Sequence, residues 1–282
     1  MWWLGGLLFI VLAPFVGGLL SGIDRKITAR MQGRIGPPVW QAFYDVAKLL
    51  QKENLVVRPT QKMYMDFFLV FTIFTGVLFF SGGDLLLVIF ALTMAGVFFV
   101  LGGYKASSPY SFIGAQRETL QMMSYEPAVL IAAVGIYMVT RSFQVAQIVH
   151  HPTLIIKDLP GVFFAFFFIL TIKFRKSPFD LSTSHHAHQE LVKGITTEFS
   201  GRTLAKIEIA HWYEYVFILG FVYLFFASNP VLGVAMALLA FFCELVIDNI
   251  SARVRWQWLL AASWGVAFVA GGANILYLML KG

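Results

Sequence analysis

The chain has 282 residues, of which 59% are hydrophobic and only 13% are charged, against about 25% charged residues in an average soluble domain. This composition excludes an ordinary soluble enzyme, and it assigns the net charge of +6 to membrane orientation rather than to nucleic-acid binding. The single cysteine, Cys243, excludes an internal disulfide and a cysteine-ligated cluster within this chain.

Long apolar runs predict an all-α polytopic membrane protein that forms one membrane domain over residues 1–282. A membrane-spanning helix needs about 20 mostly apolar residues. The first run has no basic start and no small-residue cleavage site, so it is predicted as a span rather than a signal peptide. Eight transmembrane helices are expected, at 2–23, 64–81, 85–104, 118–140, 159–173, 213–228, 231–250 and 256–280. The fifth and sixth are short by apolar count, and their polar ends are expected to continue as helix into the loops.

The distribution of basic residues predicts the orientation. Of the 21 Lys and Arg residues, 18 lie in the loops 24–63, 105–117, 173–206 and 251–255. Because cytoplasmic loops carry the excess of Lys and Arg, these loops are expected in the cytoplasm and both termini outside. The two longest, 24–63 and 173–206, are predicted to form the side on which soluble partners dock.

The first cytoplasmic loop is expected to hold a helix. After the helix-breaking GRIGPP sequence, apolar residues recur at helical spacing, which predicts an amphipathic cytoplasmic helix near 39–53. This helix lies either on the membrane surface or under a partner protein. Arg30 and Arg34 beside it are candidates for contacts with lipid headgroups or with an acidic partner.

Carboxylates inside apolar runs are costly to bury and are therefore functional hypotheses. A buried carboxylic acid can take up and release protons near neutral pH. For Glu126, the alternative is a structural ion pair with Arg117 or with a base on another helix. The candidates for a proton relay are Glu118, Glu126, Glu208, Glu214 and Glu244.

The loop 173–206 is the most polar segment of the chain. His185, His186, His188 and Glu190 are residue types that ligate metals, but their H-H-x-H-x-E spacing is not a usual zinc pattern, so no metal is predicted. Histidines titrate near pH 6.5, which suits proton uptake. A partner-docking surface with hydrogen-bonded histidines is the favoured interpretation.

Several motifs resemble the H/ND1 family of complex I membrane proteins. These are GRIGP at 33–37 followed by Asp45 and Lys48, the run Gly114, Arg117, Gln121, Tyr125 and Glu126, the PFDL sequence at 178–181, and EFSG at 198–201. Among them, Arg117, Gln121 and Tyr125 are expected to support the relay. The resemblance covers nearly the whole chain and is strongest up to Gly201.

Two departures favour one branch of that family. The segment between GRIGP and Gln41 is shorter than in the respiratory form, and STSHHAHQ between PFDL and ELV has no acidic residue. Both features resemble the membrane component of energy-converting, group 4 [NiFe] hydrogenases. The resemblance implies a non-catalytic membrane anchor and coupling subunit, which links ferredoxin-dependent hydrogen evolution to proton or sodium translocation in the cell membrane of a bacterium or archaeon.

The same resemblance implies the partners and the cofactors. No cofactor is expected in this chain, and the [4Fe–4S] and NiFe centres are expected in the hydrogenase small and large subunits. Antiporter-like membrane subunits are further expected partners, with ferredoxin as electron donor and the lipid bilayer around them. The predicted docking residues are Arg30, Arg34, Asp45, Lys48, Asp180, His185, His186, His188, Glu190 and Glu198.

Two alternatives remain at this point. The nearest is the quinone-chamber component of a respiratory NADH:quinone oxidoreductase, against which the shorter loop and the missing acids argue. The other is a stand-alone cation transporter, which the lack of internal repeats and the heavy cytoplasmic loops disfavour.

Overall fold

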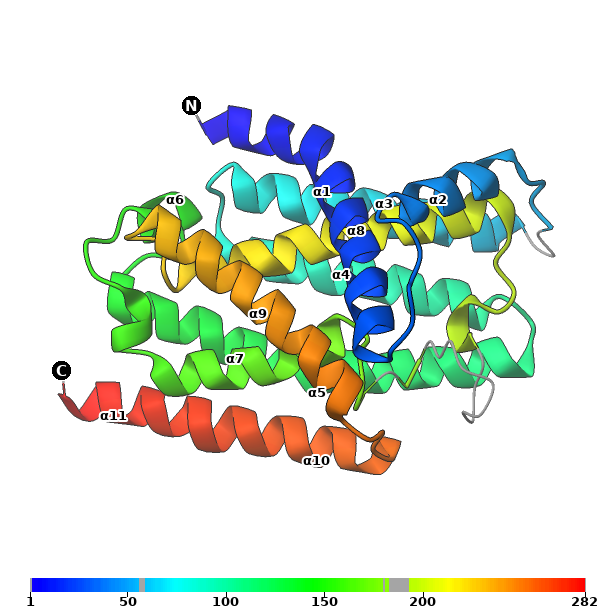
Figure 1. Cartoon of the computed structure of the whole chain (residues 1–282). Coiled ribbons are helices and arrows are strands. Elements are labelled where there is room, and N and C mark those ends of the chain that lie inside the picture. Colours follow the sequence, from blue (N-terminus) through cyan, green and yellow to red (C-terminus); the bar gives the residue numbers. More distant parts are fainter. Residues whose placement is uncertain (1, 56–58, 180, 183–192, 282) are drawn as a thin grey trace.

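The computed structural model describes residues 2–55, 59–179, 181–182 and 193–281, and these are helical with short connections (Figure 1). In chain order the elements are α1 (Trp2–Met31), α2 (Gln41–Gln51), α3 (Pro59–Phe80), α4 (Leu85–Tyr104), α5 (Pro109–Thr140), α6 (Val145–Val149), η1 (Ile155–Lys157), α7 (Pro160–Lys173), η2 (Gly194–Thr196), α8 (Gly201–Leu224), α9 (Pro230–Ile250), α10 (Trp256–Val266), the π-helical η3 (Ala267–Gly272) and α11 (Ala273–Lys281).

Six of the described helices are long and apolar enough to cross a membrane: α1, α3, α4, α5, α9 and the continuous α10–α11. The two other expected spans coincide with α7, which has only 14 residues, and with α8, whose first half carries charged residues. The total of eight spans and the outside position of the termini therefore stay predictions. The helix expected near 39–53 is present as α2.

One predicted helix boundary is wrong. The helix expected to begin at Glu118 begins at Pro109, because Pro109 is well placed in a first turn and the polar residues that follow continue the helix. The sixth span was expected at 213–228 with its polar end continuing as helix into the loop, and α8, which begins at Gly201, confirms that continuation. Polar residues that were assigned to loops are thus part of helices in the bundle, because tertiary packing outweighs their weak intrinsic preference for helix.

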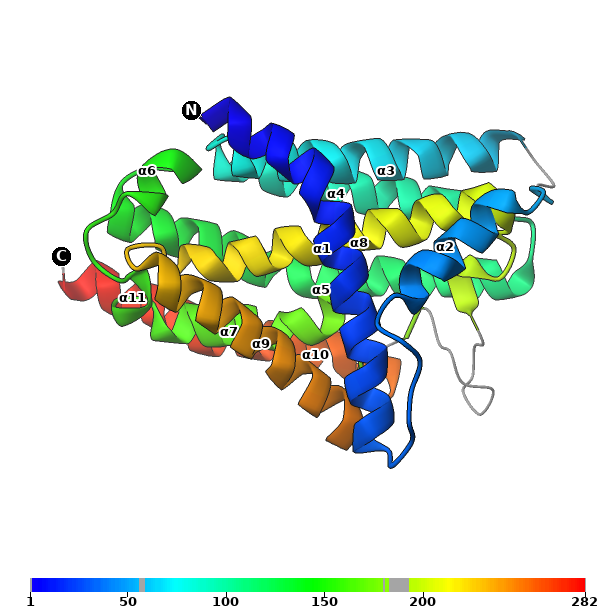
Figure 2. The same ribbon diagram turned by 45° about the horizontal axis from the view of Figure 1, so that its top comes forward.

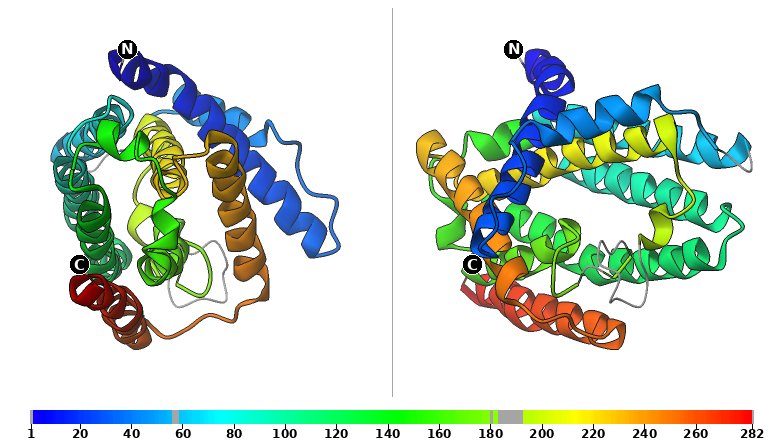
Figure 3. Two further views of the ribbon diagram at one scale, coloured as in Figure 1. Left: turned by 90° about the vertical axis from the view of Figure 1, so that its left-hand side faces the viewer. Right: turned by 45° about the vertical axis from the view of Figure 1, so that its right-hand side comes forward.

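The helices form a bundle in which α1 is set at a steep angle to α8 (Figure 2). Helix α2 lies beside the first half of α8, where the rings of Phe43 and Trp212 meet at 5.2 Å. The two views in Figure 3, one from an end of the bundle and one oblique, show α10–α11 along one side of the bundle. Aromatic pairs join the long helices inside it, such as Phe68 with Phe99 at 4.9 Å and Phe166 with Phe221 at 4.6 Å.

The segment around η2 packs against the first turns of α5. Ser111 Oγ donates a hydrogen bond to the Ile195 carbonyl at 3.2 Å, and Gly114 lies so close to the backbone of Gly194 and Ile195 that a Cβ atom there has no room. Asn54, just after α2, accepts a hydrogen bond from the Thr203 amide at 3.1 Å and caps α8. These contacts fix the start of α8 beside α5.

Candidate functional site

The end of α7 brings three cations into the bundle. The helix closes with the hydrogen-bond pattern of a Schellman motif: the Lys176 amide donates to the Thr171 carbonyl, and the Arg175 amide to that of Ile172. Arg175 takes the left-handed position of this motif, with a φ of 52°, where glycine is usual. Lys173, Arg175 and Lys176, called here the cationic segment, consequently point to different neighbours.

Arg175 joins two buried carboxylates. Its guanidinium lies 2.9 Å from Glu118 of α5 and 3.6 Å from Glu214 of α8. Burial alone would lower the pKa of Arg175, but the charges of Glu118 and Glu214 outweigh this effect and raise that pKa above its ordinary value. Arg175 therefore stays charged, and its ion pairs offset the cost of its backbone conformation.

Two more side chains complete this first ionic cluster, which consists of Glu118, Lys173, Arg175, His211 and Glu214. Lys173 Nζ lies 3.4 Å from Glu214 and 3.8 Å from the centre of the Tyr125 ring. His211, three residues before Glu214, lies 3.4 Å from it, and Arg175 approaches the Nδ1 atom of His211 at 2.8 Å. If His211 is neutral, the charges of the two carboxylates and of the two cations Lys173 and Arg175 in this cluster sum to zero.

A second ionic cluster lies next to the first and consists of Asp24, Lys176 and Asp248. Lys176 is only 5% exposed. Its Nζ lies 2.7 Å from Asp24 of α1 and 3.5 Å from Asp248 of α9. The Ser177 amide also donates to Asp248 at 2.8 Å. The cationic segment thus ties four helices, α1, α5, α8 and α9, to the end of α7.

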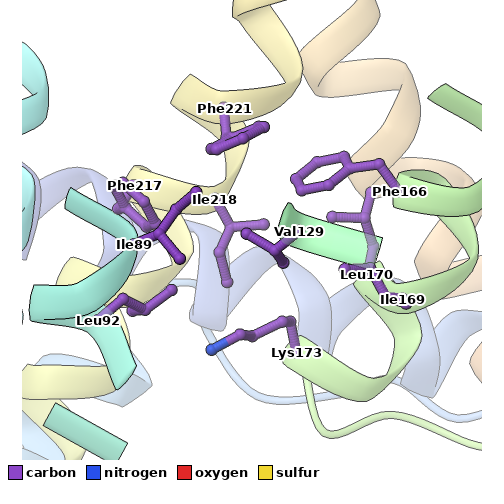
Figure 4. Close-up of a pocket in the computed structure, with 10 residues that line it drawn as sticks. All are labelled: Ile89, Leu92, Val129, Phe166, Ile169, Leu170, Lys173, Phe217, Ile218 and Phe221. Carbon is purple, nitrogen blue, oxygen red and sulfur yellow. The ribbon is translucent and has the colours of Figure 1, made fainter. Parts of the chain in front are cut away.

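An apolar cavity adjoins the first ionic cluster. It lies among α4, α5, α7 and α8 and has a volume of about 10 Å³, close to the room that one water molecule needs. Figure 4 shows the Lys173 amine at its edge. The residues that line it are Ile89, Leu92, Val129, Phe166, Ile169, Leu170, Lys173, Phe217, Ile218 and Phe221.

The structure brings together two of the five predicted relay carboxylates, Glu118 and Glu214. Glu126 and Glu208 are half-buried and make no ion pair within the described residues. Glu244 is fully buried in α9, and among the described residues neither of its carboxylate oxygens has a hydrogen-bond partner. A buried carboxyl without partners is strongly disfavoured in its charged form.

Two of the three predicted supporting residues, Gln121 and Tyr125, lie on α5 near the first ionic cluster. Gln121, one turn after Glu118, donates to the Phe179 carbonyl at 2.6 Å, and Tyr125 lies under Lys173. Arg117 is half-buried.

The predicted docking residues that are described lie at the surface. Arg30, Arg34 and Lys48 are exposed, and Glu198 is half-buried. The other five, Asp180, His185, His186, His188 and Glu190, lie outside the described residues. Within the described part of the chain, no group of three or more His, Cys, Asp or Glu side chains is arranged to hold a metal.

Asp45 forms an ion pair with Arg25 of α1 at 2.5 Å and accepts a hydrogen bond from Gln41 at 2.9 Å. Partial burial alone would raise the pKa of Asp45. The hydrogen bonds from Arg25 and Gln41, with the nearby positive charges, outweigh it and hold that pKa below its ordinary value.

Sequence reasoning missed Lys173, Arg175, Lys176 and Asp24. The three cations were counted among solvated loop residues, because the excess of basic residues in loops gave a sufficient account of them. One signal was present: three cations fall within four residues directly after an apolar helix.

Comparisons with known proteins agree with this architecture. The family model described as "NADH dehydrogenase" matches residues 5–279. Hydrogenase-4 component C of Escherichia coli is 30% identical over 69% of this chain, and the match spans 64% of that relative. The H component of NADH-quinone oxidoreductase from Syntrophotalea carbinolica is 29% identical over 90% of this chain and 87% of the relative.

The same component from Bacillus cytotoxicus is 32% identical over 76% of this chain and 68% of its own length. A solved chain from the archaeal membrane-bound sulfane sulfur reductase superposes with a TM-score of 0.84, at 24% identity, and covers 98% of this chain and 99% of its own. The last likeness concerns the fold alone. The family match over almost the full length, together with these relatives, establishes that the chain belongs to the NADH dehydrogenase family, the H/ND1 family of complex I membrane proteins.

Proposed function

We propose that this chain is the membrane anchor and coupling subunit of a multisubunit, ion-translocating [NiFe] hydrogenase. In this proposal it docks the hydrogenase small subunit through the segments 24–63 and 173–206. It links ferredoxin-dependent hydrogen evolution to proton or sodium translocation through its intramembrane carboxylates. The observation that carries the proposal is the cationic segment, which connects one flank of the docking loop to carboxylates on four helices.

The coupling we propose is electrostatic. Arg175 forms ion pairs with both Glu118 and Glu214. A proton or charge that arrives beside the loop 173–206 would therefore change the relative strength of these two ion pairs. Two unit charges about 8 Å apart interact by roughly 2 kcal/mol at an effective dielectric constant of 20. That energy corresponds to more than one pK unit, which is sufficient to move a proton between groups of similar affinity.

The hydrogenase assignment has two supports. One is the similarity to Hydrogenase-4 component C, and the other is the acid-free STSHHAHQ segment. A quinone-chamber component is the second candidate, favoured by the relatives that belong to NADH-quinone oxidoreductases. Since the two assignments differ in the electron acceptor, an activity assay separates them.

The deciding experiment uses the intact complex, purified from its native membrane through a tag on this chain. Hydrogen evolution from reduced ferredoxin is measured beside the reduction of a water-soluble quinone. The proposal expects hydrogen evolution and no quinone-dependent turnover. Quinone reduction without hydrogenase activity would establish the second candidate instead.

The docking part has its own test. Replacing His185 and His186 by Ala should lower the yield of soluble subunits that co-purify with this chain, without changing the amount of this chain in the membrane. The matched control replaces His150 and His151, the other adjacent histidine pair, which lies in the connection after α6 at the opposite end of α7. Equal retention of the soluble subunits in both double variants would refute the docking role.

A further inference from the structure

The amino end of α7 is capped by a residue from the last helix. The residue before α7, Leu159, offers no side-chain cap. Instead Asn274 of α11 accepts hydrogen bonds from the Gly161 amide at 2.7 Å and the Val162 amide at 3.2 Å. Its Nδ2 atom donates to the Asp158 carbonyl at 2.9 Å. One side chain thus satisfies two amides that a helix start leaves without partners, and it also donates to a carbonyl just before the helix.

The backbones of the two helices also touch at this point. A Cβ atom on Gly161 would lie 2.5 Å from the Ala270 carbonyl oxygen, so only glycine permits the approach. Ala270 belongs to the π-helical η3. The buried residues of α10 and η3 recur at intervals of four: Leu259, Ser263, Ala267 and Gly271.

The other end of α7 leads into the cationic segment. Helix α7 has 14 residues, which corresponds to a rod of about 21 Å. Its last residue is Lys173, and the Schellman motif fixes Arg175 and Lys176 rigidly to the same helix end. Whatever sets the axial position of α7 therefore also sets the position of all three cations relative to their carboxylates. Figure 1 shows α10–α11 alongside α7.

We propose that Asn274 is a positioning residue for the ionic clusters. It holds α7 at one axial position against α10–α11, and through α7 it keeps Lys173, Arg175 and Lys176 in register with the carboxylates on α1, α5, α8 and α9. This inference rests on the proposed coupling function, because the register of the cations matters only if those carboxylates take part in ion transfer.

The test compares Asn274→Ala with Asn229→Ala in the purified complex reconstituted into vesicles. Asn229 is a matched control, because it caps its own helix, α9, by accepting from the Leu232 amide at 3.3 Å. Hydrogen exchange and the number of ions transported per redox turnover are both measured. In Asn274→Ala, exchange of the Gly161 and Val162 amides should be about tenfold faster, as expected for a lost helix cap.

Two further readouts distinguish positioning from local capping. In Asn274→Ala the Arg175 and Lys176 amides, at the far end of α7, should also exchange faster, and the ions transported per turnover should fall about twofold, while Asn229→Ala changes neither. Faster exchange confined to residues 160–163, with normal transport per turnover, would overturn the proposal. A purely structural defect would lower the amount of complex and leave the ratio unchanged.

The conservative variant Asn274→Asp keeps the test decisive if the alanine variant does not assemble. Its carboxylate still accepts from both amides and suits the positive end of the helix dipole, although it gives up the Nδ2 hydrogen bond to the Asp158 carbonyl. Acceptance by the side-chain oxygen should therefore keep slow exchange at Gly161 and Val162 and normal transport per turnover; slow exchange at these two amides with lowered transport would overturn the positioning role of Asn274. If the complex makes no hydrogen but transports ions with another electron acceptor, the proposed function fails. The same exchange and transport measurements, made with that electron acceptor, still test the role of Asn274.

Discussion

Removing the guanidinium of Arg175 should destabilise the bundle far more than removing a surface arginine does. In Arg175→Met, Glu118 loses its only ion pair within the described residues, while Glu214 keeps Lys173 and His211. The side chains of Arg175 and Glu118 are only 14% and 7% exposed, so water replaces little of the lost interaction. Methionine can occupy the same space, so the change mainly removes charge.

The magnitude follows from burial. Breaking a buried ion pair by removing one partner costs about 3 to 5 kcal/mol, because a charge is left without compensation. At about 2 °C per kcal/mol for a chain of this size, the midpoint of thermal unfolding should fall by roughly 6 to 10 °C. Adding Glu118→Gln should restore part of this loss, since the neutral amide leaves no uncompensated charge.

The assay heats solubilised membranes and measures the fraction of the tagged chain that stays soluble. The matched control is Arg25→Met, which breaks a shorter pair, 2.5 Å from Asp45, whose side chains are 44% and 38% exposed. That loss should be under about 1 kcal/mol, because exposed ion pairs contribute little. Equal shifts for the two arginines, or a double variant less stable than Arg175→Met alone, would refute the electrostatic reasoning.

Three further predictions follow from the carboxylates. Glu126→Gln should abolish or uncouple turnover in vesicles without reducing the yield of assembled complex, and normal ion transport would remove Glu126 from the relay. Glu244→Gln should leave thermal stability equal or higher, because a fully buried carboxyl without hydrogen-bond partners contributes nothing favourable to it. Ion transport should fall in the same variant. A clear loss of thermal stability would show that Glu244 has a stabilising partner in the complex. The pKa of Asp45 is lowered in the folded chain, so its contribution to stability is present above the ordinary pKa of an aspartate and is lost as the pH falls through the folded value. The difference in unfolding midpoint between wild type and Asp45→Asn should therefore shrink from pH 7 to pH 3. A difference that stays constant over this range would contradict the role of Asp45.

The fold was largely predictable because its main signals are local. Long apolar runs placed the helices, and the spacing of Val39, Phe43, Val46 and Leu50 placed α2. The start of α5 was misplaced, because residues 109–117 were treated as loop, whereas the helical continuation of the sixth span into α8 was expected. Packing against η2 and the cap from Asn54 extend both helices beyond their apolar parts.

The candidate site was only half predictable. Glu118 and Glu214 attract notice as carboxylates near apolar runs, but nothing local indicates that Arg175 joins them across 57 residues of sequence. Hydropathy treats a buried, paired lysine and a solvated one alike, so Lys173 and Lys176 were assigned to the loop. The π-helical η3 and the cap by Asn274 depend on the close approach of two backbones, which no periodicity reveals.

The end of α7 also has a consequence for how the chain enters the membrane during synthesis. With 14 residues, α7 is shorter than the roughly 20 that span a bilayer, and its carboxyl end adds Lys173, Arg175 and Lys176. A cation drawn into the bilayer opposes insertion, by about 2.5 to 3.5 kcal/mol at most, at the bilayer centre. Asp24 and Glu118 are synthesised earlier and can neutralise two of the three as they arrive, so α7 depends on helices already in place. Loss of either carboxylate would then show first as a topology defect, before any effect on turnover.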